Sequence, residues 1–71
     1  MNFEIGKTYI IKSFNDDEIA GKLLTLGFLP ETSFLFIRKS PFGGAYYFEL
    51  NGTKIALRKE EAYAIVAEEH F

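Results

Sequence analysis

The chain has 71 residues, a length that allows one domain, which we expect over residues 1–71. A chain of this length buries only about 60% of its unfolded surface, so its core is thin. It contains no cysteine, which excludes a disulfide framework, a thiolate metal site and a cysteine nucleophile. Eight Lys and Arg residues against ten Asp and Glu residues give a net charge of −2, without the basic surplus that is typical of nucleic-acid-binding modules.

We expect neither a membrane-spanning segment nor a secretory leader. No apolar run approaches the roughly 20 residues that a transmembrane helix needs, so we expect no direct membrane insertion. The first residues, MNFEIGKTY, include the acid Glu4 and lack the apolar stretch of a signal peptide. We therefore expect a cytoplasmic protein.

The first predicted elements are a strand and a helix. Residues 7–13 (KTYIIKS) have the composition of a strand. Asn15 and Glu18 have the spacing of a capping box, which predicts that a helix begins after Asn15. The apolar residues that follow recur at helical spacing and predict a helix near residues 16–26; they are Ile19, Ala20, Leu23, Leu24 and Leu26.

The end of this helix has a glycine stop signal. Gly27 suits the left-handed position after the helix, and Phe28 would then fold back on Leu23, as in a Schellman motif. Gly21, inside the helix, costs roughly 1 kcal/mol relative to alanine. We interpret Gly21 as a site of close approach to a neighbouring strand.

The next segment, residues 32–39 (TSFLFIRK), predicts a strand that is apolar on both faces. Phe34 and Phe36 would point to one side, with Leu35 and Ile37 on the other. The Gly43-Gly44 pair that follows lacks the Lys-Ser or Lys-Thr of a phosphate-binding loop, so it predicts a turn between two strands.

The hairpin YYFEL-NG-TKIAL is the clearest local signal. Asn-Gly is the preferred pair for a two-residue type I′ turn, and this loop length determines the register. Glu49 and Lys54 then face each other as an exposed pair of opposite charge. On the inner face the predicted partners are Leu50 with Thr53, Phe48 with Ile55, and Tyr46 with Leu57.

The remaining residues complete a small mainly-β fold. KEEA after Arg58 predicts one helical turn, residues 63–67 (YAIVA) a short last strand, and EEHF a frayed tail. About five short strands and one inserted helix indicate a small barrel, because closure leaves few open strand edges.

The residue inventory does not favour catalysis. The one histidine, His70, is the penultimate residue, and no serine lies in a nucleophile-elbow sequence. Glu68, Glu69 and His70 could bind a cation, but adjacent residues seldom converge on one ion. We therefore expect no enzyme activity, no catalytic residue, no metal ligand and no cofactor.

The remaining candidate site is an apolar surface. Leu35, Ile37 and Tyr47 fall on the outer face of the sheet if Phe34 and Phe48 are inside, and Ala56 joins them. Phe42 lies at a loop tip. A cluster of exposed apolar residues indicates a partner, whereas cover by the helix or a terminus is the alternative, and both stay open.

The order of these motifs resembles the FeoA family, the small cytosolic proteins of bacterial ferrous iron uptake. The resemblance extends from Gly6 to Ala67. It rests on the Leu23-Leu24 helix with Leu26-Gly27-Phe28 and Pro30, the Pro41 loop with Gly43, and the ending Gly52…Ile55-Ala56-Leu57-Arg58…Glu61-Ala62…Ile65.

The resemblance implies an SH3-like β-barrel with an inserted helix and no enzyme activity. It also implies docking on the large membrane ferrous iron permease with a cytosolic GTPase domain (the FeoB type). The predicted partner-binding residues are Leu26, Phe28, Leu29, Leu35, Ile37, Phe42 and Tyr47. Whether docking activates or inhibits transport stays open, as does a weak homo-oligomer.

Three alternatives to docking remain. The first is a small barrel that binds nucleic acid, which the charge disfavours; the second is the SH3-like interaction domain found in metal-dependent repressors. The third is a transition-metal carrier for ferrous iron, which the lack of Cys disfavours.

Two positions depart from the family pattern. Glu31 stands where the family usually has Gly, and we expect it to shift that turn from type II toward type I. Gly44-Ala45 replaces the usual Asp-Pro and is expected to loosen the second loop.

Overall fold

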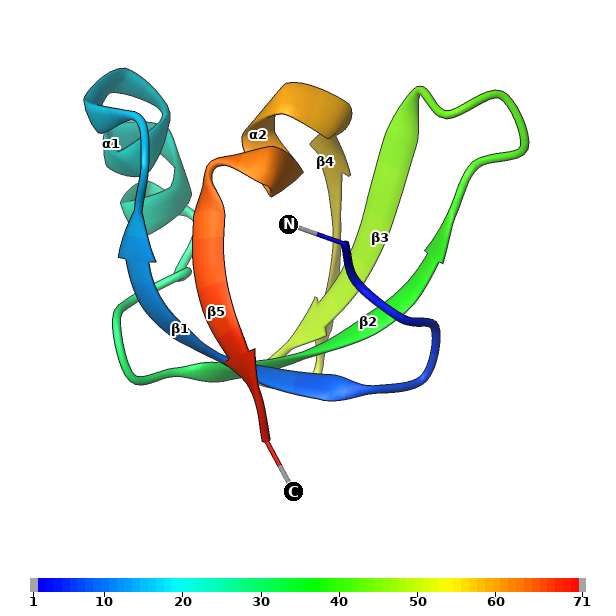
Figure 1. The fold of residues 1–71 in the computed structure, drawn as a ribbon, viewed down its shortest axis with the longest axis horizontal. Helices are drawn as coiled ribbons and strands as arrows, with labels where there is room; N and C mark the ends of the chain where they lie inside the picture. Colours follow the sequence, from blue (N-terminus) through cyan, green and yellow to red (C-terminus); the bar gives the residue numbers. More distant parts are fainter. Residues whose placement is uncertain (1, 71) are drawn as a thin grey trace.

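The computed structural model describes residues 2–70, which form one strongly curved antiparallel sheet and two short helices (Figure 1). The strand order is β4-β3-β2-β1-β5, and α2 connects the two edge strands. The predicted mainly-β class is confirmed. The elements are β1 (Thr8–Phe14), α1 (Asp17–Thr25), β2 (Ser33–Lys39), β3 (Ala45–Leu50), β4 (Thr53–Arg58), α2 (Lys59–Tyr63) and β5 (Ile65–Glu69).

Two β-bulges accompany the curvature of the sheet. The register of β1 against β5 shifts between Ile11 and Ser13, and that of β2 against β3 shifts between Phe36 and Arg38. A bulge bends its strand and increases the local twist. The two longest strands therefore curl, and the sheet wraps around its own side chains as a partial barrel (Figure 1).

Aromatic rings fill the centre of this barrel. Phe34, Phe36 and Phe48 are buried, with ring centroids 5.2–5.4 Å from Phe48 to the other two. Phe3, to which the sequence analysis assigned no role, packs against the same rings at 5.5–5.7 Å. Residues ahead of the first strand thus contribute to the core.

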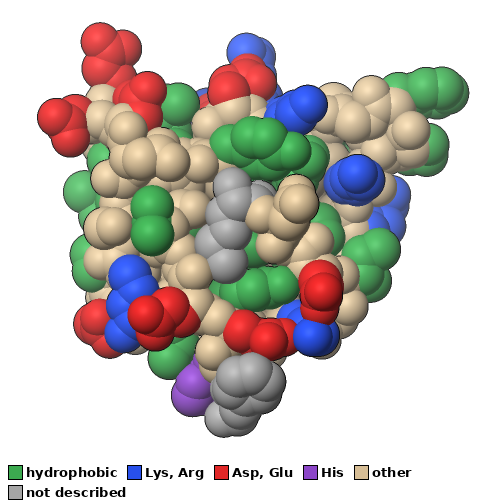
Figure 2. All heavy atoms as spheres, viewed as in Figure 1, with side chains coloured by type: hydrophobic (Ala, Val, Ile, Leu, Met, Phe, Trp, Pro, Cys, Tyr) green, Lys and Arg blue, Asp and Glu red, His purple; other side chains and the backbone are tan. Residues whose placement is uncertain are grey.

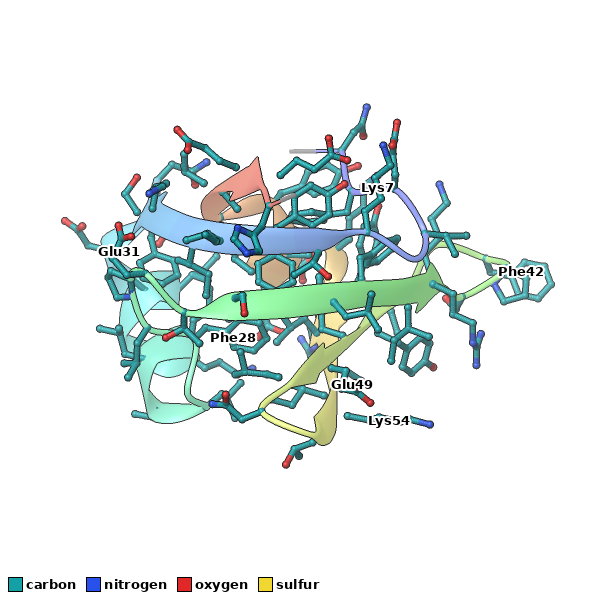
Figure 3. The ribbon with its side chains drawn as sticks, turned by 90° about the horizontal axis from the view of Figure 1, so that it is seen from below. Lys7, Phe28, Glu31, Phe42, Glu49 and Lys54 are labelled. Atoms are coloured by element: carbon teal, nitrogen blue, oxygen red, sulfur yellow. The ribbon has the colours of Figure 1, made fainter. Side chains whose placement is uncertain are left out.

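The predicted hairpin register is confirmed in all its pairs, including Glu49 with Lys54. Asn51 and Gly52 both have positive φ, 50° and 79°, as a type I′ turn requires. Glu49 and Lys54 lie across from each other (Figure 3), but these two described side chains form no ion pair within 4 Å. Of the six inner-face residues, Thr53 is exposed and Ile55 half-buried, and the other four are buried.

The start of α1 differs from the prediction by one residue. Asp16, not Asn15, caps the helix, because its Oδ1 accepts a hydrogen bond from the Ile19 amide at 3.0 Å. Asn15 instead donates from its backbone amide to Ala64 O at 2.9 Å and from Nδ2 to Tyr63 O at 3.1 Å. Both residue types are good caps, so only the contact with the end of α2 separates them.

The predicted Schellman motif at the end of α1 is confirmed. Phe28 N donates to Leu23 O at 3.0 Å, Gly27 N donates to Leu24 O at 3.1 Å, and Gly27 has φ 99°. The interpretation of Gly21 is wrong: a Cβ at that position would meet nothing within 4 Å. Gly21 lies on the solvent side of the helix, where no neighbouring strand approaches.

The turn after Pro30 also differs from the prediction. Thr32 N donates to Leu29 O at 3.1 Å and Glu31 has φ 69°, so the turn keeps the type II form with a non-glycine residue in the left-handed position. This conformation costs an L-residue about 1–2 kcal/mol. Contacts to β1 oppose that cost, because Glu31 N donates to Ile11 O at 2.7 Å.

The predicted frayed tail is wrong for the residues that the structure describes. Strand β5 continues to Glu69, which pairs with Tyr9, and His70 N donates to Thr8 O at 2.9 Å. The Glu69 carboxylate also lies 2.7 Å from Lys7 Nζ. Phe71, the last residue of the predicted tail, lies outside the described residues.

Candidate interaction surfaces

Residues 2–70 contain no pocket and no group of three or more His, Cys, Asp or Glu side chains placed to bind a metal ion. Glu68 and Glu69 are adjacent in β5, where successive side chains point to opposite faces of the sheet. None of the helices in this part of the chain is long and apolar enough to cross a membrane. The candidate sites are therefore surfaces.

Phe28 is not part of a surface, which corrects its place among the predicted partner-binding residues. Its side chain is 0% exposed and its ring centroid lies 6.0 Å from Phe34 and 5.9 Å from Phe48. The Schellman motif turns the chain at Gly27 and directs the next side chain into the barrel (Figure 3). A partner has no access to it.

The other six predicted residues lie in three separate places. Leu26 and Leu29 lie beyond the end of α1, and Phe42 lies in the loop between β2 and β3. The seven residues of β2 separate these two places by about 20 Å. Leu35, Ile37 and Tyr47 lie between them on the outer face of the sheet. The six residues do not form one patch.

The end of α1 carries the apolar corner, which we define as Leu24, Leu26 and Leu29, with exposed fractions of 41%, 40% and 49%. Leu24 is one of the apolar residues whose helical spacing predicted α1, but its side chain lies outside the core. Adjacent helical residues point about 100° apart, so with Leu23 fully buried, Leu24 faces away from the core. The two consecutive leucines, Leu23 and Leu24, were the sequence signal that could have predicted that one of them is exposed.

The outer face of the sheet is partly covered by its own side chains. Leu35, Ile37 and Tyr47 are each half-buried. The Arg38 guanidinium lies 4.5 Å from the centroid of the Tyr47 ring, a cation–π contact that covers the ring. The bulge at Phe36–Arg38 allows Arg38 to reach this face. This face is therefore less available than the apolar corner.

Glu61 joins the two helices and is almost buried, with 7% of its surface exposed. Lys22 Nζ of α1 donates to Glu61 Oε2, and the Arg58 amide donates to Glu61 Oε1 at 2.8 Å. The hydrogen bond from Lys22, followed by the one from Arg58, keeps the pKa of the Glu61 carboxyl below its usual range. The ion pair between Lys22 and Glu61 therefore connects α1, which carries the apolar corner, to α2.

We expect Glu61→Gln to lower the free energy of unfolding at pH 7 by about 1 kcal/mol, because it removes a charged hydrogen bond to a lysine that is itself exposed. A lowered pKa contributes stability that is complete above the unfolded value, 4.5, and is lost as pH falls through the folded value. The difference in melting temperature between wild type and variant should therefore shrink below pH 4.5.

The control for this experiment is Glu60→Gln, which neutralises the preceding, exposed carboxylate. It should change the melting temperature little at any pH. A Glu61→Gln deficit that stays constant from neutral to strongly acidic pH would show that the ion pair does not stabilise the fold.

Comparison with known proteins identifies relatives of this chain. The profile of the FeoA domain matches residues 1–69. No curated protein matches the chain. Among solved structures, an FeoA-like protein from Clostridium acetobutylicum has a TM-score of 0.86 and 25% identity, over 99% of this chain and 83% of that chain. Iron(II) transport protein A from Clostridium thermocellum has a TM-score of 0.86 and 28% identity, and the match covers 96% of this chain and 43% of that chain.

The same fold occurs in longer proteins. ScaR with bound Cd²⁺ has a TM-score of 0.81 and 20% identity, and the match covers 96% of this chain but only 32% of that one. This likeness concerns the fold, and it agrees with the expected SH3-like barrel with an inserted helix. With the profile matching residues 1–69, the chain belongs to the FeoA domain family.

Proposed function

We propose that this protein is a non-enzymatic accessory or regulatory protein of ferrous iron uptake, one domain over residues 1–71 that acts in the cytoplasm. It docks on the cytosolic part of a membrane ferrous iron permease that carries a GTPase domain. Membership of the FeoA family supports the link to iron uptake, as does the similarity to a protein named iron(II) transport protein A.

The observation that carries the proposal is the apolar corner. Its three leucines are 40–49% exposed at or just beyond the end of α1, and large exposed apolar side chains favour contact with another protein. The Schellman motif and the turn at Pro30 keep the corner in one conformation. A preformed surface loses little conformational entropy when a partner binds.

Leu29 is the residue with which to test docking. It lies beyond the helix cap, so Leu29→Asp should change the free energy of unfolding by no more than about 0.5 kcal/mol. It should abolish pull-down of the cytosolic part of the permease, because the aspartate would be buried in the interface without a partner. Thermal unfolding and pull-down together separate a folding defect from a docking defect.

Ile5→Asp is the matched control, since Ile5 is 70% exposed and lies in the turn before β1, away from the apolar corner. It should affect neither unfolding nor pull-down. Loss of folded protein in Leu29→Asp would show that the corner belongs to the core. Normal capture of the variant would move docking to the face of Leu35, Ile37 and Tyr47, and no capture of wild type would refute docking itself.

A further inference from the structure

The loop between β2 and β3 presents one large apolar side chain to solvent. Phe42 is 99% exposed and projects from the end of the molecule (Figure 3). Its neighbours in the loop are Pro41, Gly43 and Gly44, which have no polar side chains. The tip is therefore apolar in its side chains, and no described part of this chain covers it.

Three backbone amides of this loop are already hydrogen-bonded. Gly43 N donates to Ser40 O at 2.9 Å, and the amides of Gly44 and Ala45 donate to Ser40 Oγ at 3.0 and 3.1 Å. Unpaired amides would make transfer of the loop out of water costly. Because Ser40 pairs the amides of Gly43, Gly44 and Ala45, this cost is lower when Phe42 enters a less polar environment.

Three cations surround the base of the loop, and we call them the tip cations: Arg38, Lys39 and Lys59. Lys39 pairs with Tyr46 across the sheet, and Lys59 follows Arg58, which pairs with Ala45. All three are exposed. Glu60 is the acid next to them in the chain, so this end keeps a positive balance.

The tip cations differ from most of the lysines elsewhere in the described residues, although Lys54 also forms no ion pair. Lys7, Lys12 and Lys22 each form an ion pair with a carboxylate. No carboxylate oxygen of residues 2–70 lies within 4 Å of a tip cation. Lys and Arg side chains lie beside the β2–β3 loop, whereas one group of acids lies at the α1 end of the same view and others lie along its lower edge (Figure 2). In this view the end with the β2–β3 loop is therefore richer in cations than the α1 end.

We propose that the β2–β3 loop binds an anionic phospholipid surface. Phe42 enters the interfacial region between headgroups and acyl chains, and the tip cations contact the phosphates. A lipid surface deforms around a protruding side chain, whereas a protein partner would need a pocket shaped to receive it. One interfacial side chain is not a membrane span, and the acidic end of the molecule points away from the bilayer.

Phe42→Trp provides a specific probe, because the chain contains no tryptophan. Vesicles of phosphatidylcholine with phosphatidylglycerol should shift its emission to the blue, and vesicles of phosphatidylcholine alone should not. Adding Lys39→Gln should lower the partition coefficient about fivefold. Adding Lys54→Gln, at the opposite end of the hairpin, should change it less than twofold.

Leu29→Trp, at the apolar corner, is the positional control and should show no shift with either kind of vesicle. Absence of a shift for Phe42→Trp with anionic vesicles overturns the proposal. So does a shift of equal size with neutral vesicles, or one that Lys39→Gln leaves unchanged. A shift that needs the soluble part of the permease and not lipid assigns the tip to a protein surface and also overturns it.

Discussion

Phe48→Ala should unfold most of the protein at room temperature. Phe48 is fully buried, and its ring centroid lies 5.2–5.9 Å from those of Phe3, Phe28, Phe34 and Phe36. Truncation of a buried phenylalanine costs about 3–5 kcal/mol, and a domain of this size has only a few kcal/mol of stability. Circular dichroism during thermal or urea unfolding measures the loss.

Tyr47→Ala is the control for this prediction. Tyr47 is adjacent in β3 but lies half-buried on the outer face, where Arg38 stacks on it. It should cost about 1 kcal/mol or less, and the variant should stay folded. If Tyr47→Ala were the more damaging of the two, the assignment of inner and outer faces would be wrong.

Gly27→Ala should destabilise the protein by about 1–2 kcal/mol or more. Gly27 has φ 99°, a conformation that alanine adopts only with strain, and its Cβ would lie 3.3 Å from Leu50 Cδ2. Leu50 is buried, so it has little room to move. The strain would fall on the turn that directs Phe28 into the core.

The same substitution at Gly21 should have the opposite sign. Gly21 lies inside α1 on the solvent side, where a Cβ meets nothing within 4 Å. Alanine there should stabilise the protein by up to about 1 kcal/mol through higher helix propensity and a less flexible unfolded chain. Urea denaturation of both variants compares them directly. Effects of the same sign at both glycines would refute this account of α1.

The docking and lipid-binding proposals concern different surfaces and fail separately. The apolar corner and Phe42 lie at opposite ends of β2, about 20 Å apart. Leu29→Asp should abolish permease pull-down without changing lipid binding. Neutralising Lys39 should weaken lipid binding without unfolding the protein. Both surfaces remain intact in the Gly21→Ala variant, which makes it a stabilised background for either experiment.

Local chemistry was enough to predict the hairpin and the end of α1. Asn51-Gly52 permits a two-residue turn, and this turn together with alternation of Tyr46, Phe48 and Leu50 leaves one register. At the end of α1, Gly27 permits the left-handed conformation of a Schellman motif, and this local signal predicted where the helix ends. The peripheral position of Phe42 in a turn could also be predicted, because the residues around it cannot continue a strand.

Tertiary contacts decided what local patterns left open. Asn15 and Asp16 cap helices equally well, and the contact of Asn15 with Tyr63 and Ala64 left the cap to Asp16. Glu68 and Glu69 have the composition of a tail but pair with β1, which lies more than 50 residues earlier in the chain. Pairings between such distant segments leave no trace in local spacing.

For the candidate interaction surfaces, too, the sequence identified some of the residues and only the tertiary structure revealed the others. The sequence by itself named Leu26, Leu29 and Phe42 among the predicted partner-binding residues, and all three side chains are exposed. Only the tertiary structure showed that Phe28 is inside and Leu24 outside, and that Arg38, Lys39 and Lys59 lie at the base of the loop that carries Phe42. Burial and charge clustering depend on which strands lie side by side, and the folded sheet alone determines that neighbourhood.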